Sequence, residues 1–83
     1  DLLMPDLLHY EVNHSYIIEL KYLSEKDSDA KAETQWEEAV AQIREYAAAP
    51  KVRQFVQNTK LHCIVVQFRT WELQRMEEIP IDL

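Results

Sequence analysis

The sequence predicts an α/β domain with a small mixed β-sheet and a strand–helix–strand crossover. Three observations predict it: strand-like alternation over residues 15–23, a helical stripe of apolar residues over residues 30–48, and an apolar run at residues 61–68. A crossover of this kind is almost always right-handed when its two strands are parallel. The chain has 83 residues, which is near the lower limit for one stable core, so we expect a single domain.

The clearest strand, SYIIELKYL at residues 15–23, is rich in β-branched and aromatic side chains. Side chains alternate along a strand, so Glu19 and Lys21 share one face with Ile17 and Leu23. The other face is wholly apolar or aromatic and holds Tyr16, Ile18, Leu20 and Tyr22. We expect both faces to be partly covered, as is typical of α/β architecture. Upstream, residues 1–4 read as the end of another strand, which Pro5 stops.

The helix is expected from about Ala30 to Ala48, with Ser28 or Asp29 as its N-cap. Its buried stripe follows the spacing i, i+4, i+7 and i+11 and consists of Trp36, Val40, Ile43 and Ala47. Pro50 ends this helix or starts a short second one over residues 51–57. In that second helix we expect three apolar side chains to point inward: Val52, Phe55 and Val56.

The run LHCIVVQF at residues 61–68 is expected to form a central parallel strand, buried on both faces. A turn at Arg69 and Thr70 then leads to a last strand over residues 71–76, and the residues from Glu77 onward read as a frayed tail. Both tryptophans, Trp36 and Trp71, are expected to pack in the core or on a sheet face. The single cysteine, Cys63, is expected to be a buried thiol.

Composition excludes several classes of function. The net charge of −6 argues against a nonspecific polyanion binder, although metal ions can neutralise phosphate locally in an enzyme. With no glycine, the chain has no P-loop, dinucleotide fingerprint or nucleophile elbow. The histidines His9, His14 and His62 lack zinc-ligand spacing, and we expect the first two to be exposed beside a turn. A lone cysteine and the absence of a long apolar run favour a cytoplasmic protein without a membrane partner.

The sequence Glu19-Leu20-Lys21 is the best clue to chemistry. A carboxylate can bind a hard divalent cation, to which the Leu20 carbonyl can add a ligand, while Lys21 can place positive charge near a phosphate oxyanion or position a water. Either Asp1 or Asp6 could lie on a neighbouring antiparallel strand and bind the same metal. The alternative interpretation is an ordinary salt pair on a half-exposed strand of a generic α/β domain.

An acid, a hairpin connection and a strand ending in Glu-x-Lys resemble the signature of the PD-(D/E)XK nuclease superfamily. Downstream, QIREY at residues 42–46 is similar to the Q-x-x-x-Y motif of its RecB-type members. Over about residues 1–76 the chain is similar to nuclease-like domains found behind an AAA-type ATPase domain in uncharacterised bacterial proteins. The resemblance implies a partial restriction-endonuclease-like core.

The resemblance also implies roles for individual residues. It implies that Asp1, Glu19 and the Leu20 carbonyl hold Mg²⁺ or Mn²⁺, and that Asp1, Glu19 and Lys21 are catalytic. Gln42 and Tyr46 would orient the site or contact the substrate. We prefer Asp1 to Asp6 as the motif acid because the matching acid in the group opens a strand of the D-L-L type, but Asp6 stays open.

The expected function is therefore a metal-dependent nuclease-type domain acting on nucleic acid, with DNA favoured and an ATPase domain of the parent protein as a partner. The alternative is a catalytically inactive interaction or regulatory module attached to that ATPase. The family fold normally begins with a helix and a strand before the motif acid, and neither is present in this sequence. We therefore expect residues 1–83 to form one truncated domain, whose exposed sheet edge could pair with another chain.

Overall fold

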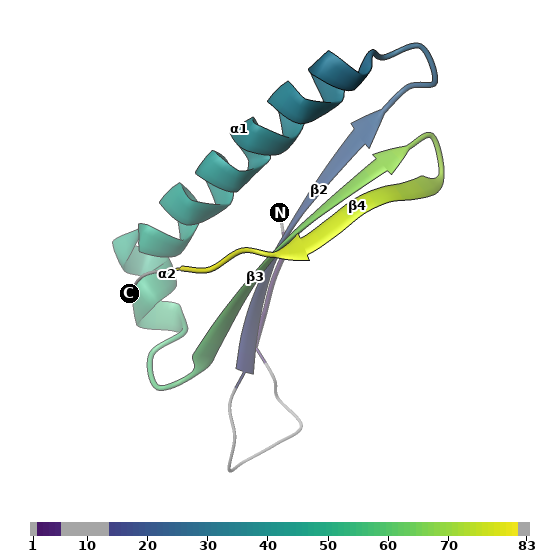
Figure 1. Cartoon of the computed structure of the whole chain (residues 1–83). Helices are drawn as coiled ribbons and strands as arrows, with labels where there is room; N and C mark the ends of the chain where they lie inside the picture. Colours follow the sequence, from purple (N-terminus) through teal and green to yellow (C-terminus); the bar gives the residue numbers. More distant parts are fainter. Residues whose placement is uncertain (1, 6–13, 82–83) are drawn as a thin grey trace.

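The computed structural model describes residues 2–5 and 14–81 of the chain. Six elements follow one another (Figure 1): β1 (Leu2–Pro5), β2 (His14–Leu23), α1 (Asp29–Ala48), α2 (Pro50–Phe55), β3 (Lys60–Arg69) and β4 (Glu72–Glu78). The strands form one sheet in the order β1-β2-β3-β4, in which β2 and β3 are parallel and both outer pairs are antiparallel. The predicted α/β fold with a mixed sheet and a strand–helix–strand crossover is confirmed.

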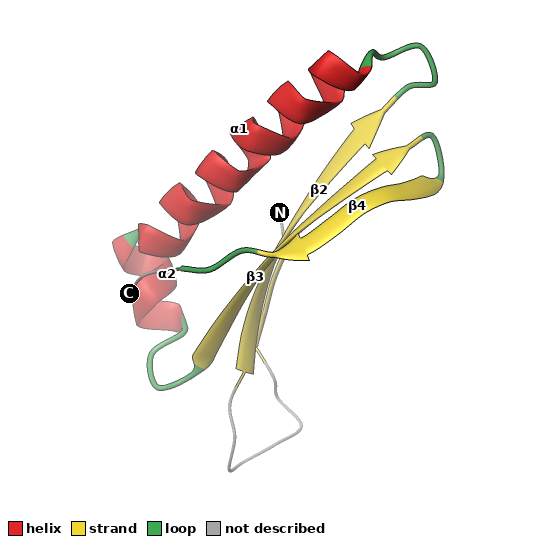
Figure 2. Ribbon diagram, in the orientation of Figure 1, coloured by secondary structure: helices red, strands yellow, loops and turns green. Residues whose placement is uncertain are grey.

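Both helices lie on the same face of the sheet (Figure 2). Ser28 caps α1, because its side-chain oxygen accepts a hydrogen bond from the Lys31 backbone N–H. Small residues on the inner side of α1, Ala39 and Ala47, let the helix approach the sheet closely. The core beneath combines side chains of α1, the α2 region and the two central strands: Ile17, Trp36, Ile43, Val52, Val56, Cys63 and Val65. The predicted helical stripe is confirmed, with Val40 partly buried at its margin.

The face of β2 that carries charge, and not its wholly apolar face, is the one covered by the helices. Ile17, Glu19 and Leu23 are buried beneath them. On the opposite face Tyr16, Ile18 and Leu20 are half-buried and Tyr22 is 63% exposed, and no helix of the described residues covers them. Alternation shows which residues share a face, but the long-range packing of α1 decides which face is covered.

Three expectations about apolar residues and the chain end are wrong. Phe55 is 57% exposed, because the six-residue α2 turns only a narrow stripe inward and Val52 and Val56 occupy it. Trp71 is 89% exposed, since it lies in the two-residue turn between β3 and β4 rather than in a strand. The residues after Glu77 are not a frayed tail: β4 continues to Glu78, and the buried Ile79 donates its backbone N–H to the Cys63 carbonyl over 2.7 Å.

The histidine expectations are also corrected in part. His14 is half-buried within β2, where its ring is hydrogen-bonded to the ring of His62 in β3, so it is not exposed beside a turn. His9 lies outside the described residues, as do Asp1 and Asp6. His14 is the first residue of the strand, one position before the start that β-propensity predicted, and the parallel ladder with β3 draws it into the sheet.

The turn between β3 and β4 stores backbone strain at Thr70. Its φ of 54° is in the left-handed region, which is unfavourable by roughly 1–2 kcal/mol for a residue with a Cβ atom and which glycine adopts freely. We expect Thr70→Gly to raise the free energy of unfolding by about 1 kcal/mol in urea denaturation. Thr34→Gly in the middle of α1 is the control and should lower stability by a few tenths of a kcal/mol. A loss of stability in Thr70→Gly would contradict the strain argument.

The thiol of Cys63 is expected to be inert in the folded chain. Burial, together with the negative charge of Glu78, raises the pKa of Cys63 from 9.0 to about 11. At pH 8 the thiolate fraction is then about 100-fold lower than in the unfolded chain, so alkylation by iodoacetamide should slow by at least that factor. Between about pH 9 and pH 11 the Cys63 thiol ionises in the unfolded chain but not in the folded chain, so the free energy of unfolding should fall across that interval. Equal alkylation rates with and without denaturant would contradict this prediction.

Candidate functional site

Glu19 and Lys21 meet on the covered face of β2. Lys21 Nζ lies 3.1 Å from Glu19 Oε1. Glu19 is only 4% exposed, whereas Lys21 is half-buried and reaches solvent. The two residues share a face, as the alternation predicts, but Glu19 is buried much more deeply than an ordinary salt pair on a half-exposed strand would require.

The second oxygen of Glu19 has no partner in the part of the chain that the structure describes. Glu19 Oε2 is buried and has no hydrogen-bond partner among the described residues. A buried carboxylate is unfavourable unless it is paired on both oxygens, and Lys21 accounts for only one of them. A divalent cation that prefers oxygen ligands would satisfy Oε2, so the Glu19 carboxylate is suited to be a ligand of Mg²⁺ or Mn²⁺.

Further ligands would have to complete such a centre. No three His, Cys, Asp or Glu side chains gather as a metal site within residues 2–5 and 14–81. Leu20 turns its side chain to the uncovered face, so it could contribute only its backbone carbonyl. The acids named from the sequence, Asp1 and Asp6, lie outside the described residues.

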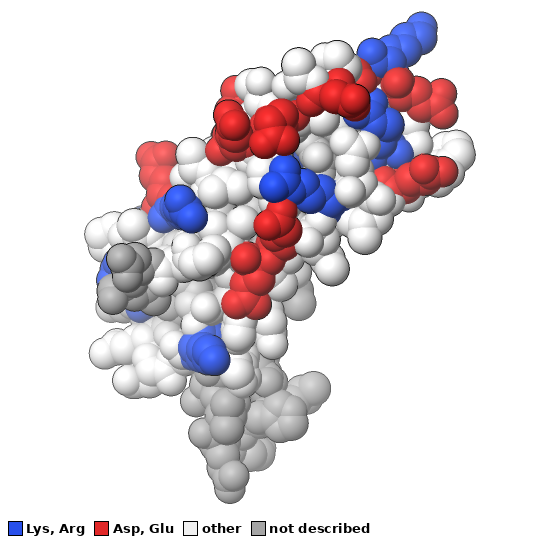
Figure 3. Space-filling view, in the orientation of Figure 1, with Lys and Arg blue, Asp and Glu red and all other residues white. Residues whose placement is uncertain are grey.

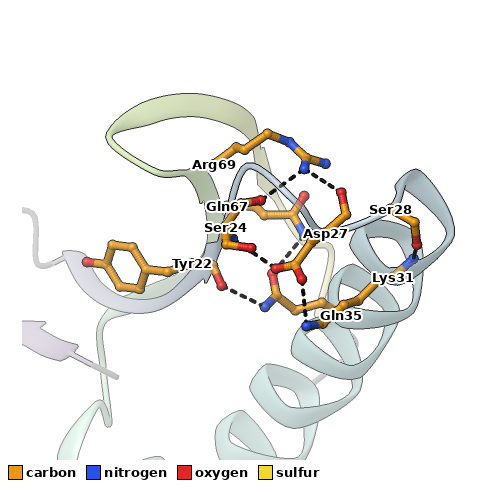
Figure 4. A network of polar contacts seen from close by, with 8 residues as sticks. All are labelled: Tyr22, Ser24, Asp27, Ser28, Lys31, Gln35, Gln67 and Arg69. Carbon is orange, nitrogen blue, oxygen red and sulfur yellow. Dashed lines mark hydrogen bonds and ion pairs between the residues drawn. The ribbon is translucent and has the colours of Figure 1, made fainter.

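A chain of amide contacts fixes α1 over the end of β2 (Figure 4). Gln35 Nε2 donates to the Tyr22 carbonyl over 3.1 Å. Gln67, almost fully buried in β3, donates to the Ala32 carbonyl and to Gln35 Oε1, each over 2.9 Å. These contacts set the rotation of α1 about its own axis, because Gln35 must face β2. Sequence reasoning missed both glutamines, although a polar Gln67 inside an apolar run was a signal.

A second set of contacts in Figure 4 holds the loop before α1. Arg69 Nη1 donates to the carbonyls of Ser24 and Asp27, over 3.1 and 2.6 Å. The Asp27 carboxylate accepts from the Ser24 N–H and pairs with Lys31 Nζ, each at 2.8 Å. The Lys31 ammonium and the Ser24 N–H lower the pKa of Asp27. The loop is thereby tied to the ends of β2 and β3, and the start of α1 is fixed with it.

Gln42 and Tyr46 lie on the flank of α1 that faces β2. They follow Gln35 by 7 and 11 residues, which places all three on one stripe of the helix. The helix runs back along β2 (Figure 1). Gln42 is about 10 Å along the helix from Gln35, and Glu19 is about 10 Å along the strand from Tyr22. By these rises, Gln42 and Glu19 lie about equally far along their elements from the Gln35–Tyr22 contact.

Neither Gln42 nor Tyr46 is hydrogen-bonded to Glu19 or Lys21 among the described residues. Both are exposed, and with Glu45 and Ala49 they line a shallow hollow of about 430 Å³ on α1. The structure thus brings Glu19 and Lys21 into contact and leaves Gln42 and Tyr46 exposed to solvent on α1.

The outward side of α1 is acidic. The helix carries five acidic residues against two basic ones, and most of these side chains are exposed: Asp29, Glu33, Glu37, Glu38 and Glu45 against Lys31 and Arg44. Figure 3 shows acidic side chains gathered over α1 on the face that it presents. This surface repels phosphate, so a nucleic acid would have to approach by another side. Neither helix of the described part has the length and hydrophobicity needed to cross a bilayer.

Comparison with family models identifies one match. The model of the PD-(D/E)XK nuclease superfamily matches residues 1–78, which is nearly the whole chain. Comparison with curated proteins and with solved structures gave no match.

Proposed function

Because the chain belongs to the PD-(D/E)XK nuclease superfamily, we propose that it is a metal-dependent domain that hydrolyses phosphodiester bonds of nucleic acid, DNA in the first instance. The observation that carries the proposal is the buried carboxylate of Glu19, with one oxygen paired to Lys21 and the other unsatisfied among the described residues. A buried carboxylate of this kind lowers the stability of the fold, and proteins retain such carboxylates at active sites.

We propose Glu19, the Leu20 carbonyl and Asp1 as the residues that would hold Mg²⁺ or Mn²⁺. The described ladder supports Asp1 over Asp6. Leu2, which follows Asp1 in the sequence, pairs with Ile18, which precedes Glu19. Pro5, by contrast, pairs with Ser15, which is four residues and roughly 13 Å from Glu19 along β2. A divalent cation bound there would supply a Lewis acid for a phosphate oxygen and lower the pKa of an attacking water.

The side chains of the chain itself would bind and orient the substrate. The Lys21 ammonium is on a flexible stem that reaches solvent, so it can contact the phosphate oxygen on which charge develops. Gln42 and Tyr46 would donate hydrogen bonds to substrate from the flank of α1 that faces β2. The contacts of Gln35 and Gln67 would hold that flank in place.

The second candidate function is an inactive interaction or regulatory module attached to an ATPase domain of a cytoplasmic parent protein. The acidic outer side of α1 favours it, because that surface repels nucleic acid. The outer strands β1 and β4 have unpaired edges among the described residues and offer a route to pairing with another chain, including a second copy.

A titration with Mn²⁺ followed by NMR separates the two candidates. In the nuclease-type domain, paramagnetic broadening should centre on residues 2–4 and 18–21 and disappear in Glu19→Gln. Cleavage of single- and double-stranded DNA should then require the metal and fall by at least 100-fold in Lys21→Met, while Lys26→Met in the exposed loop after β2 should cleave normally. A folded wild type without localised broadening would instead favour the inactive module.

A further inference from the structure

Two histidine rings face each other on the uncovered side of the sheet. His14 Nδ1 lies 2.9 Å from His62 Nε2, with the rings on the neighbouring parallel strands β2 and β3. Their side chains point away from α1. His14 is two residues from Tyr16 in β2, so both lie on the uncovered face, and His62 lies on that face too because it pairs with Tyr16 across the ladder. The pair is therefore on the opposite face of the sheet from Glu19 and takes no part in the site described above.

The spacing of these two nitrogens suits a shared metal ion. Metal–imidazole bonds are about 2.0–2.1 Å long, so two such bonds at a right angle place their nitrogens about 2.9 Å apart. Right angles between nitrogen ligands are typical of Cu²⁺ and Ni²⁺, whose sites are square-planar or tetragonal. A tetrahedral ion would need a spacing of about 3.3 Å. In the metal-free chain this contact is a hydrogen bond, in which one ring N–H points at the lone pair of the other ring. If that proton is released and each ring turns its lone pair toward a common point, the same separation of 2.9 Å fits the right-angled geometry.

The remaining nitrogen of His62 already has the partner that metal-bound histidines require. His62 Nδ1 lies 3.3 Å from both carboxylate oxygens of Glu78 in β4. A proton on Nδ1, donated to this carboxylate, leaves Nε2 with the free lone pair, as in the carboxylate–histidine–metal arrangement. In the metal-free chain His14 Nδ1–H then donates to His62 Nε2. When a metal binds, the proton of His14 would move to its Nε2 and leave Nδ1 free, so both rings bind as neutral imidazoles.

The His62 ring is also restrained in its position before any ligand binds. The Tyr16 ring stacks on His62 with centroids 4.9 Å apart and an angle of 18° between their planes. The side chain of His62 is only 16% exposed. A stacked and half-buried ring loses little rotamer freedom when it becomes a ligand, which favours binding by a small number of protein groups.

We propose that His14 and His62 form a binding site for a divalent transition-metal ion of the Cu²⁺ or Ni²⁺ type, with Glu78 orienting His62 and water filling the remaining positions. The site does not rest on nuclease activity, because it takes nitrogen ligands on the opposite face of the sheet from the oxygen ligand Glu19. It binds a different class of ion and can be tested separately.

The test is titration of the full chain with Ni²⁺, followed by calorimetry and NMR, and with Cu²⁺, followed by electron paramagnetic resonance. In the wild type we expect broadening to centre on His14, Tyr16, His62 and Glu78, and the copper spectrum to show two nitrogen ligands. His14→Asn and His62→Gln keep a hydrogen-bonding atom near the lost nitrogen while removing the imidazole. Each should weaken Ni²⁺ binding at least tenfold, and Glu78→Gln should weaken it by about tenfold.

Two controls make the result decisive. His9→Asn removes the third histidine of the chain, and Glu19→Gln removes the oxygen ligand proposed for Mg²⁺ or Mn²⁺. Both should bind Ni²⁺ as the wild type does. If either control loses as much affinity as His62→Gln, or if broadening in the wild type centres on Glu19 instead of His62, the assignment is overturned. The position of the broadened NMR signals in the wild type locates the bound ion without any variant, so the proposal stays testable even if a variant fails to fold.

Discussion

Saturating Mn²⁺ is expected to stabilise the wild type against urea and to leave Glu19→Gln unchanged. A ligand that binds only the folded chain adds RT ln(1 + [L]/Kd), which is about 2.7 kcal/mol at a hundredfold excess over Kd. The buried Glu19 is the one described side chain that we assign to the metal, so its loss should remove this gain. Urea unfolding followed by circular dichroism, with Mn²⁺ or with EDTA, measures both quantities.

The metal-free comparison tests whether Glu19 is retained for function or for stability. Glu19→Gln removes a buried charge, one oxygen of which has no partner within residues 2–5 and 14–81. It also removes the ion pair with Lys21, whose ammonium can turn to solvent. These effects oppose each other, so we expect the metal-free free energy of unfolding to change by no more than about 1 kcal/mol. Glu25→Gln in the exposed loop is the control and should match the wild type with and without metal.

Two outcomes would contradict this assignment. An equal gain from Mn²⁺ in Glu19→Gln would show that the carboxylate is not a ligand. A metal-free loss of about 3–5 kcal/mol would show instead that Glu19 and Lys21 form a structural ion pair, because breaking a truly buried pair leaves an uncompensated charge.

The strands and the long helix could be predicted from sequence because their signals are local. Period-two alternation in β2 placed Glu19 and Lys21 on one face, and the 3.6-residue period in α1 found Trp36 and Ile43. The same signals could not say which face of β2 the helix would cover. That choice depends on packing between distant segments, and it placed the charged face inside.

The candidate site was predictable only in part, for the same reason. The pairing of Glu19 with Lys21 follows from their spacing, but the register of β1 on β2 does not, so two aspartates stayed open as the motif acid. Gln35 and Gln67 act through contacts between elements 32 residues apart in sequence, which no local pattern reports. The exposure of Trp71 likewise depends on a turn formed without glycine, where the usual sequence signal is missing.

The two tryptophans provide the sharpest test of the fold, because the sequence treats them alike and the structure separates them. Trp36 is 5% exposed in the core, and its indole ring also holds the Arg75 guanidinium 4.1 Å from the ring centroid. Trp71 stands at the turn between β3 and β4 and is almost fully exposed. Fluorescence should therefore show blue-shifted emission from Trp36 in a Trp71→Ala variant and emission near that of free indole in water from Trp71 in a folded variant that lacks Trp36.

Trp36→Ala is expected to lower the free energy of unfolding by about 3–5 kcal/mol, the cost of a large cavity plus the lost contact with Arg75. At about 0.05–0.15 kcal/mol per residue, a chain of this size has only roughly 4–12 kcal/mol to lose, so the variant should be partly unfolded at 37 °C. Trp36→Phe should recover more than half of the loss because it refills most of the cavity. Trp71→Ala should stay within about 0.5 kcal/mol of the wild type. Similar losses in Trp36→Ala and Trp71→Ala, measured by urea unfolding followed by circular dichroism, would mean that α1 does not pack on the sheet through Trp36.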